Sequence, residues 1–184
     1  MRWIWIDLLL ELEHATQCVA IKNVSLAEDV VHDHFPEWFD DAGRRHDAVP
    51  VMPNTLIIEG MAQTAGILVG HARDFTENVI LAKISRAEFF AAAQPGCMLR
   101  FTAEVERIDD NGASTKGVVH RCNPAVSGPE SEIELARIDM LFSHVDRNRS
   151  GITFPDRNFV FTQSIMDMIR RSGFEIRGEL GAAV

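Results

Sequence analysis

The sequence predicts an α+β fold in which an antiparallel sheet wraps around one long buried helix. Residues 53–73 are apolar on nearly every side of a helical wheel, and a helix that is hydrophobic all round is buried. Roughly six other segments show the period-two alternation or apolar runs typical of strands. These segments lack the regular strand–helix alternation of a parallel sheet, which favours the antiparallel arrangement.

The first strands are expected close to the N-terminus. Over residues 4–12 every even position is Ile or Leu, whereas two of the odd positions are carboxylates, so the even side chains are expected to face the core. A second strand is expected over residues 15–24. Residues 25–52 then lose periodicity and collect Asp, His, Pro and Gly, which predicts a long loop with a short helix near 26–31. Loops of this length in compact domains are often functional.

The central helix is expected to start near Asn54 or Thr55, either of which can cap it. After the helix, residues 99–106 alternate apolar with polar side chains, and "DDNG" at 109–112 predicts a hairpin turn. Further strands are expected over residues 79–90, 113–122 and 132–145.

The C-terminal part of the chain is expected to be an extension of this domain. Residues 162–171, "TQSIMDMIRR", predict a short capped amphipathic helix. We therefore expect one domain over residues 1–150, on which residues 151–184 pack.

Composition limits the possible functions. A chain of 184 residues with 46% hydrophobic residues can bury the core of one domain. The net charge of -9 argues against a general nucleic-acid binder, because a phosphate backbone would repel it. The three cysteines are far apart and show no CxxC spacing, which favours neither a disulfide framework nor a zinc site. The N-terminus makes a poor signal peptide and no segment has the length of a membrane span, so we expect a cytoplasmic protein without a membrane partner.

One carboxylate, Glu59, is placed unusually within the apolar helix. Thr55, Glu59 and Gln63 follow one another at intervals of four, so they share one stripe that continues into Gly66 and Gly70. An ionised carboxylate is costly to bury without partners. Glu59 therefore pairs with an arginine or a backbone amide, is kept as an acid, or borders a cavity.

Three histidines lie in the loop before this helix: His32, His34 and His46. They are ligand types for a metal, but no recognised ligand spacing is present, and a solvated charged patch is the simpler interpretation. An imidazole that accepts a proton near neutral pH complements a sheltered carboxyl that donates one. This complement favours acid–base chemistry without a metal or another cofactor.

Four segments, taken in order, carry a resemblance to a known family. They are "LLLELEHATQCVAIKNVS", "HFP", "VMPNTLIIEGMAQTAG" and "AKISRAEFF...QPGCMLRFTAEVERI". Together they resemble the β-hydroxyacyl-acyl carrier protein dehydratases of bacterial fatty-acid synthesis over roughly residues 3–145. The resemblance implies the hotdog fold, a sheet wrapped around one helix. It also implies at least a homodimer, with a trimer of dimers as the alternative, in which a histidine of one subunit works with a carboxylate of the other.

The resemblance also implies roles for individual residues. His34 matches the family's catalytic histidine and Glu59 its helix carboxylate. Asn54 matches the backbone N–H that binds the thioester carbonyl oxygen, and Val51 matches the position whose carbonyl orients the histidine. Gln63 is expected to support Glu59 from the same helix stripe.

The sequence departs from the family in three places. Glu37 and Asn54 stand where the family has glycine. The segment between "HFP" and "VMP" is longer than in the family, so that His46 is closer than His34 to the usual spacing from Glu59. We prefer His34 as the base, because Phe-Pro follows it, and keep His46 as the alternative.

The expected function is dehydration of a (3R)-3-hydroxyacyl thioester linked to acyl carrier protein. A hotdog thioesterase, an enoyl hydratase or a non-catalytic acyl-binding protein are the alternatives. Arg44, Arg45 and Arg86 are the candidates for docking an acidic carrier protein. The C-terminal extension is expected to pack between subunits or to close the acyl tunnel.

Overall fold

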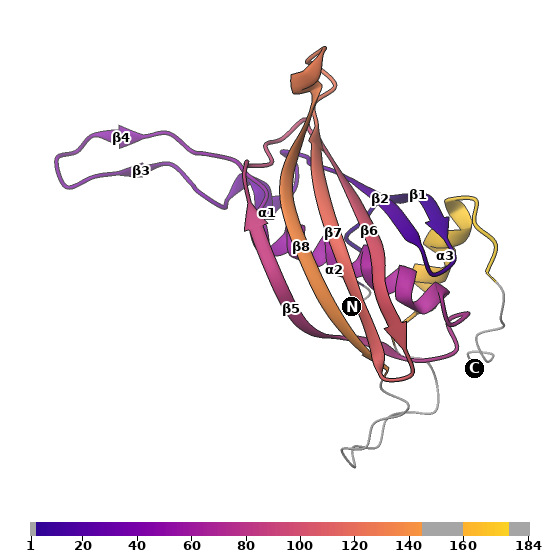
Figure 1. Ribbon diagram of the computed structural model, residues 1–184. Coiled ribbons are helices and arrows are strands. Elements are labelled where there is room, and N and C mark those ends of the chain that lie inside the picture. Colours follow the sequence, from indigo (N-terminus) through magenta and orange to yellow (C-terminus); the bar gives the residue numbers. More distant parts are fainter. Residues whose placement is uncertain (1–2, 145–159, 177–184) are drawn as a thin grey trace.

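In the computed structural model, which describes residues 3–144 and 160–176, one antiparallel sheet curves around a central helix (Figure 1). The elements in chain order are β1 (Leu8–Glu13), β2 (Gln17–Asn23), α1 (Asp29–His32), β3 (Trp38–Phe39), β4 (Arg45–His46), α2 (Asn54–His71), β5 (Val79–Phe89), β6 (Met98–Asp109), β7 (Gly112–Cys122), η1 (Pro129–Ser131), β8 (Glu132–His144) and α3 (Gln163–Arg171). The predicted α+β class and hotdog fold are confirmed.

The main sheet has six strands in the order β1-β2-β6-β7-β8-β5. Hairpins join β1 to β2, β6 to β7 and β7 to β8, and the predicted turn at "DDNG" joins Asp109 to Gly112. β5 follows α2 in the chain but pairs with β8 at the far edge of the sheet. β1 and β5 are therefore the two edges, and α2 lies across the sheet between them (Figure 1).

α2 forms the centre of the core, as its apolar sequence predicts. Ile57, Met61 and Leu68 are almost fully buried. A methyl group added at Gly60 would overlap the ring of Phe101 on β6, so the missing side chain lets the helix approach the sheet closely. The helix starts at Asn54 with Pro53 in the N-cap position and no side-chain cap bond. The expected caps by Asn54 or Thr55 are wrong, since both residues lie inside the first turn.

The expected face of the first strand is also wrong. Leu9 is 2% exposed, whereas Leu8 is 37% and Leu10 is 45% exposed. The strand begins only at Leu8, and the preceding residues Trp5 and Ile6 are buried one after the other. Alternation therefore does not run through from residue 4, and a bulge between Leu9 and Glu11 changes the pairing with β2 again.

The long loop contains a second, two-stranded sheet that the sequence did not predict. β3 and β4 pair antiparallel within an arm, residues 36–48, that projects from the body beyond β5 (Figure 1). At its base the N–H of Val49 donates a hydrogen bond to the carbonyl of Phe35 at 2.9 Å. The arm thus leaves and re-enters the body at adjacent points, as an inserted hairpin does.

The C-terminal extension packs on the same core. Met166, Met168 and Ile169 of α3 are buried, and the hydroxyl of Ser172 accepts a hydrogen bond from the N–H of Leu9 on β1 at 3.0 Å. Thr162 holds the N-cap position of α3, but its side chain makes no capping bond. The expected domain boundary near residue 150 lies outside the described residues.

Candidate active site

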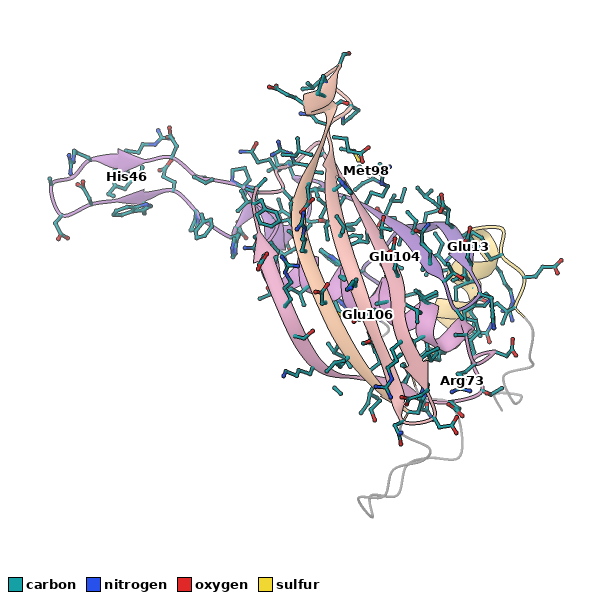
Figure 2. All side chains as sticks on the ribbon, viewed as in Figure 1. Glu13, His46, Arg73, Met98, Glu104 and Glu106 are labelled. Carbon is teal, nitrogen blue, oxygen red and sulfur yellow. The ribbon has the colours of Figure 1, made fainter. Side chains whose placement is uncertain are left out.

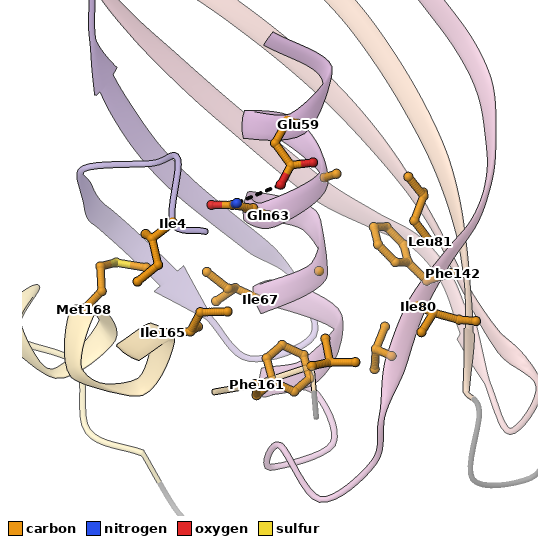
Figure 3. A pocket seen from close by; sticks show the side chains of 14 residues that line it. Ile4, Glu59, Gln63, Ile67, Ile80, Leu81, Phe142, Phe161, Ile165 and Met168 are labelled. Carbon is orange, nitrogen blue, oxygen red and sulfur yellow. Dashed lines mark hydrogen bonds between the residues drawn. The ribbon is translucent and has the colours of Figure 1, made fainter. Parts of the chain in front are cut away.

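Glu59 and Gln63 lie one turn apart on α2 and form a hydrogen-bonded pair (Figure 3). The Gln63 side-chain N–H donates to Glu59 Oε1 at 2.7 Å. The Gln63 carbonyl oxygen accepts from the backbone N–H of Trp5 at 2.8 Å and of Ile6 at 3.4 Å. Because backbone N–H groups can only donate, they orient the amide with its NH₂ group towards Glu59. Glu59 Oε2 has no bond to another described residue.

A cavity of about 260 Å³ opens beside this pair (Figure 3). Apart from Glu59 and Gln63, its lining is apolar or backbone: Ile4, Ala62, Gly66, Ile67, Val79, Ile80, Leu81, Phe142, Val160, Phe161, Ile165 and Met168. A concave apolar site with a few convergent polar groups is the usual form of a small-molecule pocket. Of the three options for Glu59, the structure therefore supports a position at the border of a cavity, and no arginine contacts it among the described residues.

Asn54 opens α2 and is exposed. The first backbone bonds of the helix run from the N–H groups of Leu56 and Ile57 to the carbonyl of Pro53. In the described structure, the N–H groups of Asn54 and Thr55 precede these bonds and have no acceptor. Free amides at the positive end of the helix dipole favour an oxygen that gains negative charge.

His34 lies directly before the base of the arm and is exposed. Its ring packs against that of Phe35, with the ring centres 4.4 Å apart. The bond between Val49 and Phe35 joins the chain just after His34 to the chain just before Val51. The inserted arm therefore leaves the "HFP" segment that contains His34 next to the chain that leads into the "VMP" segment.

His46 lies on β4 in the arm, away from the sheet and α2 (Figure 2). Its ring stacks on Trp38 with centres 4.2 Å apart and an interplanar angle of 8°. Its Nε2 lies 3.4 Å from Asp40 Oδ2. The pKa of Asp40 is lowered, chiefly by the hydrogen bond from the Arg44 backbone N–H, so this carboxylate is an ionised partner within the arm.

Neither histidine touches Glu59 within one protomer. In residues 3–144 and 160–176, no hydrogen bond or ion pair joins Glu59 to His34 or His46. Closure of the acyl tunnel was one of the two roles expected for the C-terminal extension, but the sequence did not single out Phe161, Ile165 and Met168, which line the cavity. The amphipathic pattern of residues 162–171 indicated a buried face but not what that face covers.

Comparison with known proteins identifies the family. Residues 5–123 match the model of the FabA-like domain. This chain belongs to the FabA-like family. It is 35% identical over 124 residues to the 3-hydroxyacyl-[acyl-carrier-protein] dehydratase FabZ of Chlamydia caviae, covering 66% of this chain and 72% of that protein. The enzyme of the same name from Solibacter usitatus is 33% identical over 133 residues, covering 71% and 75%.

Solved structures related to this FabA-like chain share its fold at low sequence identity. An acyl-CoA hydrolase of Staphylococcus aureus with bound butyryl coenzyme A has a TM-score of 0.53 and 14% identity, covering 74% of this chain and 71% of that chain. The dehydratase heterocomplex ApeI:P of Xenorhabdus doucetiae has a TM-score of 0.51 and 16% identity, covering 80% and 85%. Identities this low establish only the common fold.

The three expected docking cations of the FabA-like chain are all paired with neighbouring carboxylates. Arg44 contacts Asp40 at 2.7 Å, and Arg86 contacts Glu88 at 2.5 Å. Arg45 contacts Glu37 at 2.7 Å and Asp47 at 3.3 Å. These residues therefore do not form an unbalanced basic patch.

Metal ligands and disulfides do not contribute to the described site. Within the described ranges, no group of three metal-ligating side chains comes together. Cys18, Cys97 and Cys122 are all free, and burial raises the pKa of Cys18 to about 12. In this part of the FabA-like chain no helix is long and apolar enough to cross a membrane.

Proposed function

We propose that this protein dehydrates (3R)-3-hydroxyacyl thioesters, linked to acyl carrier protein, to trans-2-enoyl thioesters in fatty-acid biosynthesis. Membership of the FabA-like family and the identity of 32–36% to eight curated dehydratases of this name support the reaction class. The observation that carries the proposal for this chain is the pair of Glu59 and Gln63 at the border of an apolar cavity. The carboxyl can act on the β-carbon of a substrate whose acyl chain lies among apolar side chains.

The reaction requires a base, an acid and a stabilised oxyanion. His34 removes a proton from the carbon next to the thioester carbonyl. The electron pair of that C–H bond forms the new double bond as the bond between the β-carbon and the hydroxyl breaks. Glu59, in its acid form, gives its proton to the departing hydroxyl, which leaves as water. The proton taken by His34 then returns to Glu59 through solvent, which restores both groups.

Asn54 and Val51 supply the backbone groups of the proposed mechanism. The free N–H at Asn54 donates to the thioester oxygen as that oxygen gains negative charge. Asparagine serves here in place of glycine because only its backbone N–H is required. The carbonyl of Val51 orients the imidazole of His34, which lies at the same end of the arm.

The proposed active unit is a homodimer in which His34 of one subunit works with Glu59 of the other. Support comes from the two edges of the sheet. α3 packs on β1, whereas no described strand pairs with the outer side of β5. Ile80, Leu81 and Ile84 on β5 are exposed, and an open apolar edge is a template for pairing with a second chain.

The proposed setting is the cytoplasm. The three free cysteines fit a reducing compartment, in which structural disulfides are rare. The carrier-protein thioester is preferred to the coenzyme A thioester because the curated relatives are named for it.

Two substitutions test the reaction. His34→Ala and Glu59→Gln are each expected to reduce formation of the enoyl thioester at least ~10²-fold, the lower range for loss of a general acid or base, while circular dichroism remains that of the wild type. His46→Ala should retain activity, since this side chain contacts only the arm. Unchanged turnover in His34→Ala or Glu59→Gln would refute the mechanism. Release of free thiol without enoyl product would assign a thioesterase instead.

A further inference from the structure

Three separate parts of the chain form the cavity. The stripe of α2 that begins at Glu59 forms one side of the cavity. A second side comes from β5 and from Phe142 of β8 (Figure 3). The remaining wall consists of Ile4 and the segment 160–168. This last segment lies outside residues 5–123, which match the family model. Most of this wall therefore comes from the C-terminal part of the chain, beyond the residues that match the family model.

Phe161 closes the cavity at the end of α2 opposite Glu59 (Figure 3). It is 2% exposed, and its ring lies over Gly70, where an added methyl group would overlap it. Phe75 packs edge-on against the same ring, with the centres 5.0 Å apart. The ring is thus held from two sides and cannot move outwards without losing both contacts.

Ile165 and Met168 extend this wall along α3. They are three residues apart, so they lie on the same side of the helix, and both line the cavity. Behind them, Met166 and Ile169 are buried in the core, and Ser172 is bonded to β1. The wall is therefore attached to the body by packing that does not involve the cavity.

The distance from the acid to this wall is set by α2. Glu59 and Gly70 are separated by eleven residues, which at 1.5 Å per residue is about 16 Å along the helix. A cavity of about 150 Å³ admits benzene, so the 260 Å³ here have room for an acyl group larger than a benzene ring. The chain must nevertheless end where Phe161 closes the space.

We propose that Phe161, Ile165 and Met168 form an end wall that limits the length of the acyl chain, which makes them specificity-determining residues. The proposal rests on the proposed function in that the ligand is an acyl thioester whose β-carbon lies at Glu59. Affinity rises with each methylene that enters the cavity, by about fourfold per group, and stops rising when the chain reaches Phe161.

Binding of unreactive ligands tests the wall. Amide analogues of saturated acyl-pantetheine thioesters, from butyryl to palmitoyl, neither lose water nor hydrolyse, and their Kd values can be measured by calorimetry with the full-length protein. Phe161→Ala is expected to shift the longest favourable chain to greater length. Ile165→Phe adds volume on the cavity side and is expected to shift it to shorter length. The butyryl analogue should bind all variants equally.

Met166→Ala is the matched control. Met166 is buried on the same helix but does not line the cavity, so its truncation lowers stability without changing the dependence on chain length. The proposal would be overturned if Ile165→Phe left the longest favourable chain length unchanged, or if Met166→Ala shifted that length as much as Ile165→Phe does. Turnover of 3-hydroxybutyryl-acyl carrier protein by the wild type is measured in parallel. Absence of turnover would refute the proposed reaction, whereas the binding series would still show whether the wall limits the length of the acyl chain.

Discussion

The hydrogen bond from Gln63 to Glu59 predicts that two substitutions at one position separate stability from catalysis. Gln63→Glu retains an oxygen that accepts from the N–H groups of Trp5 and Ile6 but loses the donor to Glu59. Gln63→Leu loses these three bonds and also the longer one, at 3.5 Å, from the Gln63 amide to the backbone carbonyl of Trp3. We therefore expect both variants to misplace the acid, and only the second to leave buried N–H groups unpaired.

The magnitudes follow from these contacts. An unsatisfied buried donor costs about 1–3 kcal/mol, and Trp5 and Ile6 are both buried, so Gln63→Leu should lower the free energy of unfolding by about 3 kcal/mol. For a chain of this size that corresponds to a Tm lower by roughly 6–12 °C. A hydrogen bond between neutral groups is worth about 0.5–1.5 kcal/mol, and Glu59 acts in its neutral acid form, so losing this bond should reduce kcat roughly 2- to 13-fold in either variant.

The assay combines thermal unfolding with the pH dependence of kcat on a 3-hydroxyacyl thioester. In Gln63→Glu two carboxyls share one site, which raises the pKa of one of them. The limb of the pH profile that reports loss of the acid proton should therefore move to higher pH, which a purely structural role for Gln63 would not cause. Wild-type kcat and an unchanged pH profile in Gln63→Glu would refute the positioning role.

Two further predictions concern the arm and the end of α2. Replacement of residues 37–47 by Asn-Gly should leave Tm and turnover close to wild type, because the bond between Val49 and Phe35 already closes the base; activity as low as in His34→Ala would instead assign a catalytic role to the arm. Burial, and secondly the charge of His14, lower the pKa of His71 below 6.5. Between that lowered value and about 6.5 the unfolded chain binds more protons, so stability falls on acidification through this range. His71→Phe should lose less free energy of unfolding between pH 7.5 and 5.5 in denaturant titrations, and an equal loss would contradict this cause.

Particular elements show how far local pattern reaches. α2 could be predicted to within two residues at each end, because a segment that is apolar all round can only be buried. β8 was predicted over residues 132–145, and its apolar positions from Ala136 to Phe142 are buried on one face, because alternation there is uninterrupted. β1 failed because a break before Leu8 and a bulge after Leu9 change the phase, and neither leaves a mark in the pattern of side chains.

The candidate site divides in the same way. The motif and the stripe of α2 predicted Glu59 and Gln63 as site residues, and the structure places them together at the border of the cavity, since spacing along one helix determines which side chains share a face. The roles of His34, Asn54 and Val51 stay predictions that the proposed substitutions and a dimeric structure can test. The long insertion, which set His46 against His34 in the sequence, has a simple form in space: a hairpin whose ends are bonded to each other.

The sequence by itself therefore determined the buried helix, most of the strands, the family and the carboxylate of Glu59 on the central helix. Only the tertiary structure decided that Trp5 and Ile6 orient the amide beside that carboxylate, and that Phe161 lines the cavity. The physical reason is range. Periodicity reports how a segment meets the core, whereas these contacts join residues far apart in the chain, and their partners depend on how the whole chain packs.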